Sequence, residues 1–194
     1  KSGDGKSVTG DITIGVGSSS DIGGNVDINA GNSSQNVGGD VNISSGISEQ
    51  SKSGEVILSS ASSSSSGKVS IGSGDATNGA TGTVSIASGK SADGSSGSVS
   101  VSVGTAAVGV GGEVSLVAGS TTAKNSEGGS IGIISGSSIN SDSGFVHIAS
   151  ADSESFESGI IELSSGSGAT SGNIMLKSGD GKSVTGDITI GVGS

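Results

Sequence analysis

The 194-residue sequence contains no proline, cysteine, tryptophan or tyrosine, and its only aromatic residues are Phe145 and Phe156. Without cysteine there is no disulfide scaffold. Without large side chains a compact globule cannot fill its core at the usual packing density. A run of about 18 apolar residues is also missing, so no segment is suited to cross a membrane as a helix. These absences exclude disulfide-rich, ordinary globular and helical membrane-spanning classes.

Positive charge is scarce as well. Eight basic residues, all of them lysines, stand against 18 acidic ones, which gives a formal net charge of −10. Binding of nucleic acid requires clustered Lys and Arg to neutralise phosphates, so we do not expect a nucleic-acid partner. The chain starts at Lys1 without a signal-like apolar stretch, and we expect it to be a fragment of a longer repeat array.

The chain is rich in two small residues, with 39 Gly and 49 Ser. Such a composition is typical of disordered linkers, but the aliphatic residues here are strictly placed. Thirteen times a glycine, which we call the anchor, is followed two and four positions later by an aliphatic pair such as Val26 and Ile28. The anchors are Gly10, Gly24, Gly39, Gly54, Gly67, Gly82, Gly97, Gly112, Gly129, Gly144, Gly159, Gly172 and Gly186.

Alternation of aliphatic and mostly polar residues is typical of a β-strand with one buried face. Seven positions after each anchor stands a second small residue, Gly in most repeats and Ala61 or Ala151 in two. Glycine at both points would permit the positive φ angles of sharp corners. We therefore predict an all-β fold: a two-sided parallel β-solenoid (β-helix) of about 15 residues per turn and 12–13 turns, with a thin core of Val, Ile and Leu facing Ser, Ala and Gly.

Repetition continues at longer range. Six-turn units cover about residues 10–96 and 97–185, and residues 177–194 repeat residues 1–18 without change. We predict that residues 1–194 form one continuous solenoid segment. Further copies of the same repeat are then its expected partners along a fibre axis.

The predicted outer face of the strands turns apolar in the second half of the chain. We call these residues the lateral stripe; they are Val117, Ile134, Phe145, His147, Ile160 and Met175. In a solenoid, Phe145 and Ile160 would stack at the same position of adjacent turns. Contiguous exposed apolar surface usually marks a contact site, so the stripe is predicted to bind a second filament of the same chain or another filament protein. His147 is predicted to be a surface side chain.

No constellation for catalysis is recognisable. The Gly-Lys-Ser triplets lack the earlier glycine of a phosphate-binding loop, and the single histidine has no orienting acid beside it in sequence. We predict no enzyme activity and no cofactor; aspartates one position after several anchors suggest at most diffuse Ca²⁺ binding. Glycosylation sequons begin at Asn32 and Asn42, so glycans are possible partners, with Asn32 the better acceptor because Asn42 falls on a predicted strand.

The phrases from Gly67 to Gly74 (GKVSIGSG) and from Gly82 to Gly89 (GTVSIASG), each followed by a Ser/Gly/Ala-rich arm, resemble repeat regions of very large surface proteins of diatoms and other heterokont algae. This resemblance implies an extracellular or cell-surface location. It also implies a structural function, as the shaft of a filament, flagellar hair, wall component or adhesive fibre. The alternative is a solenoid binding module for carbohydrate, ice or mineral.

Overall fold

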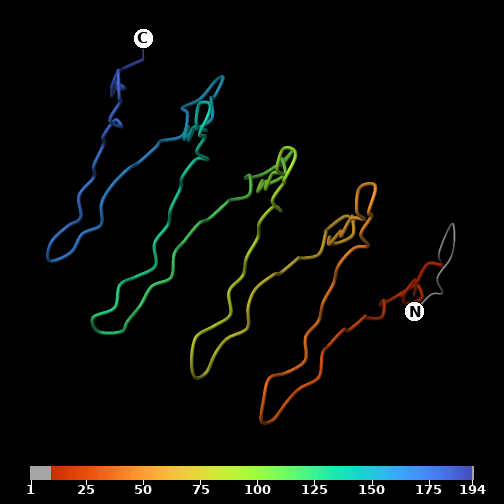
Figure 1. The fold of residues 1–194 in the computed structure, drawn as a ribbon. Coiled ribbons are helices and arrows are strands. Elements are labelled where there is room, and N and C mark those ends of the chain that lie inside the picture. Colours follow the sequence, from red (N-terminus) through yellow and green to blue (C-terminus); the bar gives the residue numbers. More distant parts are fainter. Residues whose placement is uncertain (1–9, 194) are drawn as a thin grey trace. The chain divides into compact units, whose positions relative to one another are not determined.

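The computed structural model describes residues 10–193, in two units, Lys1–Val99 and Ser100–Ser194. No helix and no β-strand is present in the described part of either unit (Figure 1). The chain consists instead of segments without a bend, which we call runs, and of short, sharp bends that separate them. Each unit is therefore a succession of similar local loops.

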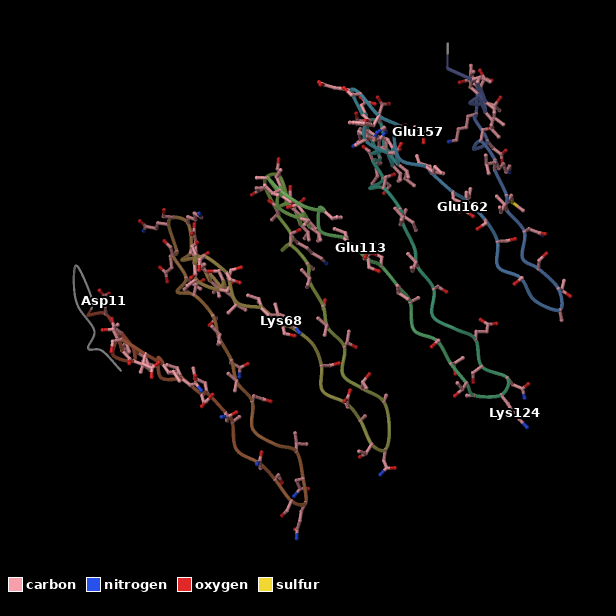
Figure 2. All side chains as sticks on the ribbon, turned by 180° about the vertical axis from the view of Figure 1, so that it is seen from behind. Asp11, Lys68, Glu113, Lys124, Glu157 and Glu162 are labelled. Atoms are coloured by element: carbon pink, nitrogen blue, oxygen red, sulfur yellow. The ribbon has the colours of Figure 1, made fainter. Side chains whose placement is uncertain are left out.

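One bend follows each of the first twelve anchors, and it falls at nearly the same place each time, about 10 to 12 positions after the anchor. The bends comprise residues 20–21, 34–36, 49–51, 63–65, 77–79, 92–94, 107–109, 123–125, 139–141, 154–156, 168–170 and 182–183. Lys124, labelled in Figure 2, lies at the tip of one such loop. The Ser-rich half of the repeat thus turns the chain, and the half that carries the aliphatic pair runs without a bend.

A hydroxyl group stabilises six of these bends. In each case the side chain stands nine positions after the anchor, and its oxygen accepts a hydrogen bond from a backbone N–H two or three residues later. The acceptors are Ser19, Ser33, Ser48, Thr121, Ser138 and Ser153. Ser and Thr commonly fold the chain back in this way, so the sequence accounts for the position of these bends.

Four backbone hydrogen bonds close the loop around a bend. The anchor N–H of Gly39 donates to the carbonyl of Gly31, which stands seven positions after the preceding anchor, over 2.9 Å. The same bond joins Gly54 to Gly46, Gly129 to Gly119, and Gly144 to Gly136. These bonds connect residues only eight to ten positions apart within one loop. They do not form a ladder between successive repeats.

No residue of the described part is buried. Six residues are half-buried, and all of them stand six positions after an anchor: Ala30, Ser45, Ala118, Ser135, Ser150 and Ser178. The most protected side chains are therefore small ones, and four of the six lie directly before a glycine that accepts a closing bond. The aliphatic pairs are exposed throughout.

The predicted parallel β-solenoid is wrong. Between residues 10 and 193 there is neither a strand, nor a ladder from turn to turn, nor a core of Val, Ile and Leu. The physical reason is that short loops close locally, while ordering many Gly residues costs much conformational entropy. A thin aliphatic layer facing Ser and Gly offers little buried area to offset that cost. The observed architecture is that of an open, low-complexity chain.

The predicted corners are misplaced too. Among the described residues, positive φ angles occur only at Gly79, Gly109 and Asn125, all of them at bends. The anchors and the glycines seven positions later lie in the runs between bends. As for the duplicated segment, residues 1–9 and 194 of the pair 1–18 and 177–194 lie outside the described residues.

Candidate functional site

The most regular structural feature is the contact between one repeat and the next, which we call the joint. It consists of the residues six and seven positions after one anchor together with the following anchor and the residue before it. At the joint of Ala30 and Gly31 with Gly38 and Gly39, the backbone bond from Gly39 to Gly31 closes the loop. The joint combines that bond with a half-buried residue six positions after the anchor. We call this place in each repeat position six.

Glycine is required at two of the anchors because the backbone there approaches the preceding repeat too closely for a side chain. A Cβ atom on Gly24 would lie 2.7 Å from Cγ1 of Val16, and one on Gly112 would lie 2.7 Å from Cγ1 of Val103. Real Cβ atoms do not approach other atoms so closely. At nine further anchors the corresponding distance, to the Cβ of Ala or Ser at position six, is 3.3–3.9 Å. Most of these distances are ordinary van der Waals contacts, and a Cβ on the last anchor, Gly186, would have nothing within 4 Å, so steric approach explains the glycine at Gly24 and Gly112 only.

Valine at position six is partly covered where it faces the following anchor. Val16 faces Gly24 and is 52% exposed, and Val103 faces Gly112 and is 48% exposed.

The residue before the anchor varies together with position six. At the four joints where position six is Val or Ala, the next anchor is preceded by glycine, as in Val16 with Gly23. At the eight joints where position six is Ser, it is preceded by Ser or Thr, as in Ser45 with Ser53. The four apolar joints form two pairs at equivalent places of the six-repeat units. Two kinds of joint, apolar and hydroxylated, thus recur along the chain.

The lateral stripe lies on the open surface of the second unit. Its five apolar members, Val117, Ile134, Phe145, Ile160 and Met175, are 81–92% exposed, and His147 is exposed as well. Phe145 and Ile160 retain too much exposure to cover each other. As a contact surface for a partner, the stripe remains a prediction.

Both predicted glycosylation sites are exposed. Asn32 stands directly before Ser33, whose hydroxyl accepts from the N–H of Asn36 in the bend at 34–36. Asn42 lies in a run without a bend, between the aliphatic residues Val41 and Ile43. The structure thus places the two sequons in different surroundings. One lies beside a bend that a hydroxyl stabilises, which we call a capped bend, and the other lies within an aliphatic pair.

Charged groups are dispersed. Lys52 pairs with Glu55 over 2.8 Å and Lys177 with Asp180 over 3.6 Å, all at exposed side chains. Figure 2 shows Lys68, Glu113 and Glu162 on separate runs of the chain. Across residues 10–193 no three His, Asp or Glu side chains gather as a metal site would require. That part of the chain also encloses no pocket. It forms no helix long and apolar enough to cross a membrane.

The sequence patterns, interpreted as a solenoid, did not predict the joint. A usable signal was nevertheless present. The distance from each anchor to the small residue seven positions later never changes, whereas the distance from there to the next anchor ranges from six to ten residues. The segment between the small residue and the next anchor varies in length, which indicates a loop. The segments of constant length on either side of that loop indicate a fixed contact.

Comparison with protein-family models, with curated proteins and with solved structures finds no match to this chain.

Proposed function

We propose that this chain is a structural component of an extracellular or cell-surface filament in which copies of the repeat cover one another's aliphatic side chains. The observation that carries the proposal is the exposure of the pairs: between residues 10 and 193 every pair member is between 47% and 87% exposed. Full burial of one Val, Leu or Ile side chain stabilises by about 1.5–3 kcal/mol. Association is thus the available way to remove this apolar surface from water.

The open backbone supports the same proposal. Proline is absent, so every residue beyond the first carries a backbone N–H donor. Only four backbone bonds are present among the described residues. Unpaired donors and acceptors beside exposed aliphatic residues favour pairing with another chain.

A second copy is the partner that fits best, because its aliphatic pairs recur at the same spacing. Successive anchors are 13 to 17 residues apart in every part of the chain, so two copies can match over many repeats at once. Many weak contacts then add up to stable association, as in other repetitive assemblies. The extracellular location is supported by the resemblance of the repeat phrases to algal surface proteins.

Sedimentation velocity and negative-stain electron microscopy, over a range of protein concentrations, test this proposal. The test variant replaces Val41, Val56, Val69 and Val84, the first members of four pairs, with Ser. Its matched control replaces four aliphatic residues outside the pairs, Ile47, Val108, Val110 and Ile139, with Ser. The control residues are all more than 90% exposed.

We expect the unchanged chain and the control to form elongated assemblies as concentration rises, and the pair variant to remain monomeric. A chain that stays monomeric at every concentration would contradict the proposal. Equal loss of assembly in both variants would also contradict it, because overall hydrophobicity and not the pairs would then drive association.

A further inference from the structure

The bend at residues 77–79 contains Asn78 followed by Gly79, and no other asparagine of the chain is followed by glycine. Both residues are exposed, and Gly79 has a φ of 115°. In the part of the chain that the structure describes, no atom beyond the two neighbouring residues lies within 4 Å of the place where a Cβ on Gly79 would be. The bend is therefore open around Gly79, and no other described segment crowds it.

This pair of residues can react without an enzyme. The backbone nitrogen of Gly79 attacks the side-chain carbonyl carbon Cγ of Asn78, and a C–N bond forms. The side-chain nitrogen leaves as ammonia, taking with it the proton of the Gly79 amide, and a five-membered succinimide ring results. Water then opens the ring at either carbonyl, adding hydroxyl to that carbon and a proton to the ring nitrogen. The product is aspartate, or isoaspartate in which the main chain passes through Cγ.

A second asparagine at the same place in another repeat shows what would hinder this reaction. Asn140 and Asn78 both stand eleven positions after their anchors. After Asn140, the N–H of Ser141 donates a hydrogen bond to Oγ of Ser138 over 3.0 Å. In the repeat of Asn78, the position of Ser138 is occupied by Ala76, which has no hydroxyl. Among residues 10–193, no hydrogen bond occupies the N–H of Gly79.

We infer that Asn78 is a site of spontaneous modification, at which the uncapped bend 77–79 converts to aspartate and isoaspartate through a succinimide. The hydroxyl at position nine protects Asn140 by holding the attacking N–H away from the side-chain carbonyl. Ala76 leaves Asn78 without this protection.

The modification changes the chain in two ways. A carboxylate replaces a neutral amide, which adds one negative charge to a chain whose formal net charge is −10. The isoaspartate product also inserts a methylene group into the main chain at a bend that sets the direction of the next run. In a long-lived structural protein, conversion of this residue would accumulate with age and alter one bend in the first six-repeat unit. The chemistry itself does not depend on the proposed function.

The full chain, incubated at neutral and mildly alkaline pH and then digested, tests the inference by mass spectrometry of the peptides with Asn78 and Asn140. We expect conversion at Asn78, faster at higher pH because the attacking amide must lose its proton, and much slower conversion at Asn140. Ala76→Ser should supply the missing acceptor and slow conversion at Asn78 about two- to fivefold, the factor implied by one exposed hydrogen bond. Gly79→Ser should slow it further by crowding the nitrogen.

Repeating the incubation in concentrated urea separates the bend from the dipeptide sequence. There the Ala76→Ser variant and the unchanged chain should convert at equal rates, because the cap is lost. An Asn78 that converts no faster than Asn140 would overturn the inference. So would an Ala76→Ser variant that converts as fast as the unchanged chain in the absence of urea.

Discussion

Cγ1 of Val16 lies 2.7 Å from the place that a Cβ atom would occupy on Gly24, and Val103 stands in the same relation to Gly112. A side chain on either anchor would have to displace the valine or separate the two repeats. The two relationships occur at equivalent places of the two six-repeat units. The glycines at these two anchors are thus a consequence of the joint.

Substitution of Gly24 by Ala should open its joint. Overpacking of this kind costs about 1–3 kcal/mol where the surroundings cannot yield. We expect nuclear Overhauser contacts between the Val16 methyl groups and residue 24 to disappear. Gly17→Ala is the control, because a Cβ at Gly17 has nothing within 4 Å. Loss of the contacts in both variants would show that the joint does not depend on this approach.

The residue type at position six varies together with the residue before the next anchor. This predicts that substitutions at the two places have coupled effects on the stability of the joint. Ser45→Val should weaken its joint, because the added methyl groups crowd Gly54 and cover the hydroxyl of Ser53 without giving it a partner. Adding Ser53→Gly should restore the joint, as in the natural pair of Val16 and Gly23. We expect a coupling of about 0.5–1 kcal/mol, at the low end for residues in contact. Amide exchange at Gly54, whose N–H donates to Gly46, measures it; strictly additive effects would refute the coupling.

Removal of a cap should loosen a single bend. Oγ of Ser33 accepts from the N–H of Asn36 over 3.0 Å. Ser33→Ala should therefore speed amide exchange at Asn36 about two- to fivefold, in line with one modest hydrogen bond. Ser33→Thr keeps the hydroxyl and should leave the rate nearly unchanged. If exchange at Asn36 is the same in the Ala variant, the cap does not stabilise the bend.

If the lateral stripe is a contact surface, its residues should affect the side-by-side association of filaments. Replacing Phe145 and Ile160 with Ser should abolish side-by-side association of filaments and leave the individual filaments intact, since the pairs are unchanged. Replacing Phe156 and Ile139, which are exposed at bends, is the matched control and should have no such effect. Electron microscopy distinguishes single filaments from bundles. Bundles that persist in the stripe variant would contradict the prediction that the lateral stripe is a contact surface.

Much of the local order follows from the sequence. The thirteen anchors and their pairs are visible without a structure, and Ser33 or Ser138 in a Ser-rich stretch is a recognisable turn residue. Alternation at Val41 and Ile43 predicts a β-strand, and this prediction is wrong, because the structure has an unbent run without a strand there. Alternation does not say which residues will pair with that run, because pairing depends on the balance between buried area and chain entropy over many repeats.

The joint was harder to foresee for a similar reason. Gly24 is compatible with a positive φ, with a bulge or with a close approach, and its sequence does not distinguish among these. The approach of Val16 decides between them, and it depends on the course of the chain through the intervening bend. The exposure of Phe145 and Ile160 does not distinguish them from the aliphatic pairs, which are exposed as well, so the lateral stripe stays a prediction.

Residue-resolved amide hydrogen exchange on the dilute, monomeric chain tests most directly whether the isolated chain is open. Protection is expected at the closing donors Gly39, Gly54, Gly129 and Gly144 and, more weakly, at the capped bends. The amides of aliphatic pairs such as Val41 and Ile43 should exchange at the rates of unstructured peptides. Uniform strong protection of the pair amides through successive repeats, as a ladder from turn to turn would give, is the result that would contradict the account.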